Sequence, residues 1–171
     1  MAHPSNVPAR VLLRGVLVAI VALLLVALIP ANAQAADLAP GWRHEMLMRV
    51  NAIRAEAGAP ALRPCGALRR SAQQYAMVMA STDAYGHVGQ DGSEPWNRMT
   101  RQGYTWRVAA ENIAGGQRSV AEVVEDWVAS PDHYANLINP ALRHVGFGYS
   151  ADPASTYGSY WVQNFGSGHG C

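Results

Sequence analysis

The feature that most constrains the fold is an unbroken apolar stretch near the N-terminus, Val16–Ile29. Arg10 and Arg14 precede it, Pro30 follows it, and small residues then recur at the A-x-A spacing that signal peptidase accepts. This order is typical of a secretory signal peptide, and we expect cleavage after Ala35. The alternative is a membrane anchor. A spanning helix needs roughly 18 or more apolar residues, however, and lengthening the stretch toward the N-terminus would bury Arg14.

Residues 36–171 are then left to fold, and this length suits one domain because a domain typically takes about 100–200 residues. The whole chain has 13 basic and 12 acidic residues, and its arginines form no run in the sequence. A nucleic-acid binder would carry a clustered basic excess, so we expect no nucleic-acid partner. No later stretch is apolar enough to cross a membrane. We therefore expect a monomer that is secreted, either extracellular or in the cell envelope.

Only two cysteines are present, Cys65 and Cys171. Export makes a disulfide chemically possible, and two cysteines allow one intramolecular pairing. We favour the bridge, because an exposed thiol at Cys171 would otherwise be oxidised. The alternative is two unpaired thiols.

Apolar residues recur at helical spacing over residues 42–57 and again over 67–82, which predicts two amphipathic helices. The first apolar stripe consists of Met46, Val50, Ile53 and Ala57. Arg49, Arg54 and Glu56 fall off this stripe, so we expect them outside the core.

The rest of the chain changes character more often. The further predicted elements are a functional loop at 85–94, a short helix at 95–102, strands at 108–113, 145–149 and 160–165, and helices capped by Ser119 and Ser130. Helices on both sides of a few strands predict an α/β fold with three layers, α-β-α.

Three side chains stand out as candidates for chemistry. His87 lies in a glycine-rich loop, where loop geometry rather than periodicity aims it. Glu111 lies in a predicted strand among small and apolar residues, and a carboxylate there is costly to bury unless it is paired or ligating. His133 lies in the first turn of a predicted helix, where the helix dipole disfavours imidazolium.

Two histidines and one glutamate are a ligand set that zinc accepts, with water in the fourth position. The alternatives are surface histidines and a satisfied hydrogen-bond network. The chain has no H-E-x-x-H, no G-x-S-x-G, no P-loop and no dinucleotide fingerprint, and neither cysteine has the surroundings of a nucleophile.

Taken in order, motifs along residues 43–166 resemble the bacterial branch of the CAP superfamily, the cysteine-rich secretory, antigen 5 and pathogenesis-related (SCP-like) proteins. The motifs are Val50-Asn51-Ala52-Ile53-Arg54, Gly86-His87 with Asp91-Gly92-Ser93, Glu111-Asn112-Ile113-Ala114, Ser130-Pro131-Asp132-His133-Tyr134-Ala135-Asn136 and Tyr160-Trp161-Val162-Gln163-Asn164-Phe165. Each motif alone is weak evidence for the resemblance, whereas the whole set in this order is specific for the family.

The resemblance implies an α-β-α sandwich with a large central cleft, in which histidines and glutamates of many members can hold a divalent cation, commonly zinc. By motif, His87, Glu111 and His133 match the first histidine, the first glutamate and the second histidine. The second glutamate of eukaryotic members falls at Ser130, so a three-ligand version is implied here. Asp132 would raise the pKa of the neighbouring His133 imidazole, against the effect of the helix terminus. From the same motifs, Asn112, Asp91, Asn136 and Ser130 are expected to support the cleft.

Three functions follow as hypotheses. The first is a binding module whose cleft holds a divalent metal, zinc or another divalent cation, and a small lipid, sterol, peptide or cell-surface glycan. The second is a metal-dependent hydrolase, a peptidase, with Glu111 as ligand or general base. The third is a structural extracellular domain with a non-catalytic polar network.

Overall fold

A four-stranded sheet forms the middle layer of the fold, with the strand order β1-β3-β4-β2. The computed structural model describes residues 38–171, and the predicted signal peptide lies outside them. The strands are β1 (Arg63–Pro64), β2 (Thr105–Gly115), β3 (His144–Ala151) and β4 (Ser159–His169). β1 pairs parallel to β3, while β4 pairs antiparallel to both β3 and β2. The two outer strands of this sheet are therefore β1 and β2.

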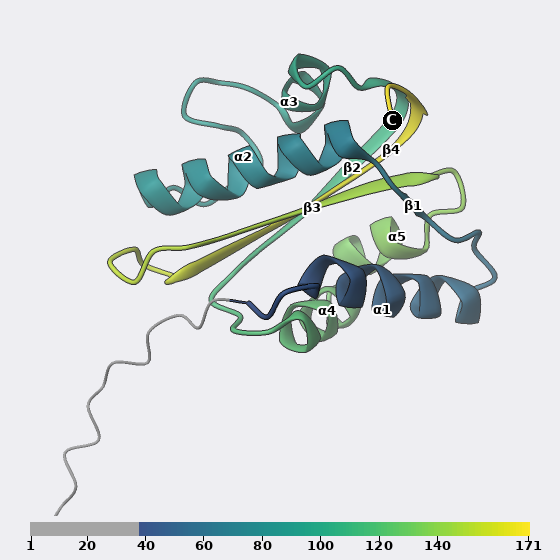
Figure 1. The fold of residues 1–171 in the computed structure, drawn as a ribbon, viewed down its shortest axis with the longest axis horizontal. Coiled ribbons are helices and arrows are strands. Elements are labelled where there is room, and N and C mark those ends of the chain that lie inside the picture. Colours follow the sequence, from purple (N-terminus) through teal and green to yellow (C-terminus); the bar gives the residue numbers. More distant parts are fainter. Residues whose placement is uncertain (1–37) are drawn as a thin grey trace, which may run out of the picture. The chain divides into compact units, whose positions relative to one another are not determined.

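Helices cover both faces of this sheet (Figure 1). The helices are α1 (Trp42–Glu56), α2 (Gly66–Thr82), α3 (Pro95–Arg101), α4 (Val120–Ala129) and α5 (Pro131–Ile138). α2 and α3 lie on one face, and α1, α4 and α5 lie on the other. The predicted three-layer α-β-α architecture is confirmed. Within residues 38–171, no helix has both the length and the apolar character needed to cross a membrane.

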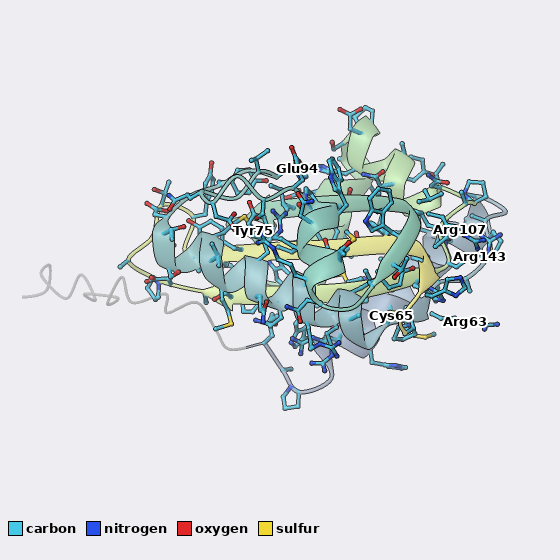
Figure 2. All side chains as sticks on the ribbon, turned by 90° about the horizontal axis from the view of Figure 1, so that it is seen from above. Arg63, Cys65, Tyr75, Glu94, Arg107 and Arg143 are labelled. Atoms are coloured by element: carbon cyan, nitrogen blue, oxygen red, sulfur yellow. A yellow bond between two sulfur atoms is a disulfide. The ribbon has the colours of Figure 1, made fainter. Side chains whose placement is uncertain are left out.

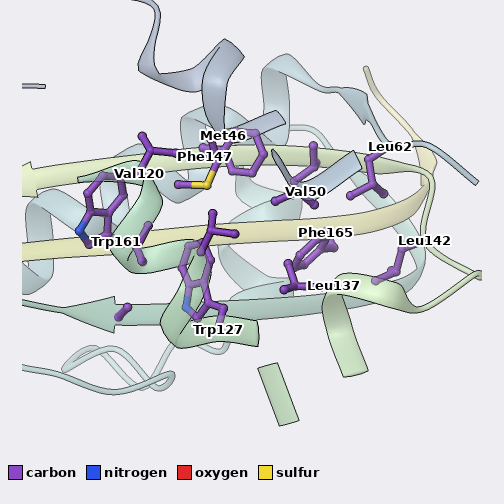
Figure 3. Packing of buried hydrophobic residues seen from close by; sticks show 14 residues of the cluster. Met46, Val50, Leu62, Val120, Trp127, Leu137, Leu142, Phe147, Trp161 and Phe165 are labelled. Carbon is purple, nitrogen blue, oxygen red and sulfur yellow. The ribbon is translucent and has the colours of Figure 1, made fainter. Parts of the chain in front are cut away.

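The largest apolar core lies between the sheet and the layer of α1, α4 and α5 (Figure 3). Its largest buried side chains include Met46, Trp127, Leu137, Trp161 and Phe165. β3 contributes Val145 and Phe147 to this core. Since side chains alternate along a strand, the residues between and after them, Gly146 and Gly148, face α2.

The glycines of β3 let α2 lie directly on the sheet. A Cβ at Gly146 would meet the backbone nitrogen of Arg69 at 2.1 Å and the carbonyl carbon of Leu68 at 2.2 Å. Those are backbone atoms of a packed helix, which cannot move aside one at a time. Overpacking of this kind typically costs about 1–3 kcal/mol and occasionally more.

We therefore expect Gly146→Ala to lower the free energy of unfolding by about 3 kcal/mol, at the upper end of that range. Urea denaturation measures this change. Gly86→Ala is the matched control, since a Cβ at Gly86 meets nothing within 4 Å and should leave the unfolding midpoint almost unchanged. Equal midpoints for the two variants would contradict the close packing of α2 on β3.

The predicted position of Arg54 outside the core is wrong, because its side chain is completely buried. Its guanidinium donates hydrogen bonds to the carbonyl oxygens of Pro60 at 2.7 Å, Leu137 at 2.7 Å, Asn139 at 3.1 Å and Leu142 at 3.1 Å. The last carbonyls of a helix have no partner within it, and Arg54 supplies donors for those at the end of α5. Arg54 also lies four residues after Val50 and eight after Met46, so the helical spacing of α1 places it on the buried face.

Cys65 and Cys171 form a disulfide across a sequence separation of 106 residues. It ties the segment that follows β1 to the chain just beyond the end of β4. The capping of α4 is also confirmed, since Ser119 Oγ accepts from the backbone N–H of Glu122 at 3.2 Å. Ser130 occupies the N-cap position of α5, but its side chain makes no capping hydrogen bond.

Candidate functional site

Glu111 lies in the middle of β2, and only 1% of its side chain is exposed. The carboxylate is compensated by Arg98 of α3, whose Nη2 donates to Oε1 at 3.1 Å and to Oε2 at 3.0 Å. Burying a carboxylate is tolerable only when a partner compensates its charge. The expectation that Glu111 is paired or ligating is met by an arginine.

Arg98 also fixes the loop before it. Its guanidinium donates to the carbonyl oxygens of His87 at 2.9 Å and Ser93 at 2.7 Å. Its Cζ lies 3.4 Å from the centroid of the Tyr75 ring, within the range of a cation–π contact. Sequence reasoning missed Arg98. The buried glutamate signalled the need for a cation, but nothing in the sequence says which arginine reaches it.

His87 contacts the same carboxylate, with Nδ1 3.0 Å from Glu111 Oε1. An ionised carboxylate only accepts hydrogen bonds, so Nδ1 carries a proton and, in the neutral ring, Nε2 carries the free lone pair. About half of the His87 side chain is exposed. The buried carboxylate of Glu111 therefore fixes the orientation of the His87 ring, and Nε2 of His87 is available to a ligand.

Asn164 completes the surroundings of the carboxylate from β4, where it is the cross-strand partner of Glu111. Only one orientation of its amide gives both ends a partner. In that orientation the amide nitrogen donates to Glu111 Oε2 at 2.9 Å, and the amide oxygen accepts from Ser71 Oγ at 3.0 Å. Glu111 then accepts four hydrogen bonds, two on each oxygen.

His133 reaches the site from the opposite layer. Asn112 follows Glu111 in β2, so its side chain faces the α5 side of the sheet. Asn112 Nδ2 donates to the carbonyl oxygen of His133 at 3.1 Å, and Asn136 Nδ2 donates to Asn112 Oδ1 at 2.9 Å. Asn112 and Asn136 thus hold the first turn of α5 against the sheet.

The pKa of His133 is lowered, first by burial of the ring and then by the charge on His87, while Asp132 opposes both effects. The effect of Asp132 expected from the sequence is present but outweighed. The lowered pKa favours the neutral imidazole of His133 near neutral pH. The effect of His87 on this pKa shows that the two histidines are near each other. The two histidines come from different layers, and β2, which carries Glu111 and Asn112, is an outer strand of the sheet.

A pocket of about 290 Å³ opens beside His133. Ser130 and Trp127 line it as well, and two tyrosines, Tyr85 and Tyr157, contribute aromatic surface. The centroids of these two tyrosine rings lie 5.0 Å apart. Ser130 thus shares the pocket with His133, whereas Glu111 and His87 are not among the residues that line it.

Asp91 organises the loop that carries His87. Its Oδ1 accepts from the backbone N–H of Ser93 at 2.9 Å, and its Oδ2 accepts from Arg101 at 3.0 Å. These hydrogen bonds, led by those from Ser93, lower the pKa of Asp91 well below its usual value. Its role is to shape the loop.

A protein metal site needs several ligand side chains close together. Within residues 38–171, no three His, Cys, Asp or Glu side chains are grouped so that they could hold one. Arg98 takes both oxygens of Glu111, and its positive charge opposes a cation there. As a three-ligand set, His87, Glu111 and His133 therefore do not fit. What fits is a carboxylate that orients a histidine whose other nitrogen is free, as around many metal sites.

The sequence profile of the cysteine-rich secretory protein family, CAP, matches residues 47–165. The chain belongs to this family. The family resemblance expected from the ordered motifs is confirmed. The uncharacterized protein YkwD of Bacillus subtilis is 33% identical over 124 residues, covering 72% of this chain and 46% of that protein. This CAP chain therefore spans less than half the length of that relative.

Solved structures share the CAP fold. An extracellular protein with an SCP domain from Bacillus anthracis superposes with a TM-score of 0.65 at 21% identity, covering 77% of this chain and 44% of that one. An outer surface protein of Borrelia burgdorferi superposes with a TM-score of 0.66 at 21% identity, covering 76% of this chain and 95% of that one. At these identities the likeness shows the fold alone.

Proposed function

We propose that this CAP domain is a secreted binding module, whose cleft at the edge of β2 takes a small ligand through the imidazoles of His87 and His133. The observation that carries the proposal is the state of Glu111. Three donor groups, Arg98 Nη2, His87 Nδ1 and Asn164 Nδ2, make four hydrogen bonds to its carboxylate and occupy its roughly four lone-pair sites, so it acts by orienting His87. The pocket beside His133 provides aromatic surface for an apolar part of the ligand.

The ligand class follows from this pocket. At about 290 Å³ it lies near the lower end of small-molecule sites, which span about 300–1,000 Å³. Its lining combines aromatic rings with Ser130, Gln117 and Asp126. These features favour a small lipid or sterol fragment, a peptide side chain or a sugar unit over an extended polymer.

We propose that the same cleft takes a divalent cation such as zinc through two protein ligands. His87 Nε2 and a ring nitrogen of His133 would hold it, and Glu111 would orient His87 without ligating. When bound, the cation would supply an electron-accepting centre for an oxygen of the ligand. Two protein ligands are fewer than structural or catalytic zinc sites use, so we expect moderate affinity.

Peptide hydrolysis is less well supported than binding. The hydrolase hypothesis gives Glu111 the role of ligand or general base, and a base must have a lone pair directed at the attacking water. Here the lone pairs of Glu111 are already used by Arg98, His87 and Asn164. Incubation of the zinc-treated protein with a peptide library tests this directly, because chelator-sensitive cleavage would favour the hydrolase.

Secretion is proposed on two grounds. The stretch Val16–Ile29 and the small residues before Ala36 have the order of a cleaved signal peptide. Two proteins of the same fold are an extracellular protein and an outer surface protein.

Calorimetric titration with zinc tests the cleft. We expect His87→Ala and His133→Ala each to weaken binding by about 100-fold, and Glu111→Gln by about 10- to 100-fold through loss of orientation. His169→Ala is the matched control, since His169 is an exposed histidine at the end of β4. No uptake by the wild type at micromolar zinc would remove the cation from the proposal. A lipid or sterol overlay with the same variants then decides between a module and a purely structural network.

A further inference from the structure

A second and larger pocket lies at the other end of β2. It has a volume of about 620 Å³, and it is lined by the starts of β2 and β3, the end of β4 and residues around β1. None of its lining residues lines the pocket beside His133. Arg63, Arg107 and Arg143 all line it, and they gather at one end of the molecule (Figure 2).

The charge around this pocket has one sign. The lining includes the three arginines and His144 but no acidic residue. Among residues 38–171, none of the three guanidinium groups takes part in an ion pair. Arg143 donates to the carbonyl oxygens of Pro140 and Leu142, whereas the side chains of Arg63 and Arg107 have no hydrogen bond to a described residue.

The backbone of the fold places these three like charges close together. The backbone N–H of Arg63 donates to the carbonyl oxygen of Arg143 at 2.9 Å, so the two residues are neighbours across β1 and β3. Arg107 lies where the register of β2 against β4 shifts, between Trp106 and Val108. A bulge of this kind re-aims a side chain, and bulges are frequent beside functional sites.

The positive charge of these arginines affects the pKa values of neighbouring side chains. The pKa of His144 is lowered by burial and then by the charge of Arg63. Burial raises the pKa of Tyr104 to about 12, and Arg107 acts against that rise. The Cys65–Cys171 disulfide holds the chain end beyond β4 next to β1.

We propose that this pocket binds an organic phosphate, with Arg63, Arg107 and Arg143 contacting the oxyanion. The planar guanidinium donates two parallel hydrogen bonds to phosphate, and three such groups without counter-charges are suited to a dianion. Pro60 and Val108 belong to the same lining and provide apolar surface for the organic part of the ligand. This site does not depend on the histidine cleft.

Calorimetry with glycerol phosphate tests the site, with glycerol as the neutral probe. The test variant is Arg63→Gln/Arg107→Gln, since neither side chain has a hydrogen bond whose loss would unfold the domain. The control is Arg69→Gln/Arg118→Gln, which removes the same formal charge from two exposed positions outside the pocket. We expect the test variant to lose at least about tenfold in affinity and the control to stay within about twofold.

Two further arms identify the source of the phosphate. Inorganic phosphate that competes with glycerol phosphate supports a site for the free oxyanion. Flotation with phosphatidylglycerol vesicles, but not with phosphatidylcholine vesicles, supports the same site with a lipid headgroup as its ligand. The proposal is overturned if no phosphate compound binds at about 10 mM, or if the two double variants lose the same affinity, because binding would then follow net charge alone.

Discussion

Replacing Arg98 with methionine is expected to lower the free energy of unfolding by about 3–5 kcal/mol, the usual cost of leaving one partner of a buried ion pair alone. The change leaves the Glu111 carboxylate, 1% exposed, with His87 and Asn164 but without its compensating charge. It also removes the donors that hold the loop at His87 and Ser93, and the cation over Tyr75. Urea denaturation of the purified domain measures the loss.

Two further variants separate charge compensation from simple truncation. Arg98→Met/Glu111→Gln removes both charges, so it should cost less than Arg98→Met alone. Arg101→Met is the matched control, because the Arg101–Asp91 pair has side chains that are 61% and 58% exposed. An exposed pair of this kind contributes at most about 1 kcal/mol. A single Arg98→Met change as mild as Arg101→Met would contradict the role given to Arg98.

Loss of the Cys65–Cys171 disulfide is the other large effect. The bridge closes a loop with a sequence separation of 106 residues. On the chain-entropy account, closing a loop of that length restricts the unfolded chain enough to stabilise the fold by about 4–5 kcal/mol. We expect urea denaturation with a phosphine reductant to show a loss of that size.

A variant without thiols serves as the reference for this measurement. Cys65→Ser/Cys171→Ser should have the stability of the reduced wild type and should not respond to the reductant. If reduction leaves the unfolding midpoint of the wild type unchanged, the disulfide does not contribute in the way that loop closure predicts. The bridge lies beside β1, which carries Arg63. Phosphate binding in the pocket lined by Arg63, Arg107 and Arg143 (the arginine pocket) can therefore also be measured for the reduced wild type and for the variant without thiols.

Local patterns predicted most of the fold. Helical spacing of apolar residues located α1 and α2, and the serine and proline signals located the starts of α4 and α5. β1 was missed because a strand of only two residues, Arg63–Pro64, has no period to recognise. The first residues of β2 were also missed, since Thr105, Trp106 and Arg107 are exposed and show no alternation.

The site was predicted less completely, for a different reason. His87, Glu111 and His133 could be joined only through the order of the family motifs, because their contacts are long-range. Arg98 and Arg54 show the limit most clearly. Both arginines are buried by partners that lie elsewhere in the chain, and neither local composition nor spacing reveals such a partner.

The arginine pocket was invisible in the sequence for the same reason. Arg63, Arg107 and Arg143 are far apart in the chain and look like isolated surface charges. They meet only because β1, β2 and β3 start at the same end of the sheet. An absence of basic runs therefore says little about where an anion can bind on the folded domain.

In the proposed function, Glu111 orients His87 so that ligands are taken by His87 Nε2 and His133. Long-range ¹⁵N–¹H correlation spectra of the histidine rings test it most directly, with His87→Gln used for assignment. We expect His87 Nδ1 to stay protonated throughout a zinc titration, while His87 Nε2 and one nitrogen of His133 shift together. Loss of the proton from His87 Nδ1, or histidine nitrogens that do not respond to zinc at all, would contradict it.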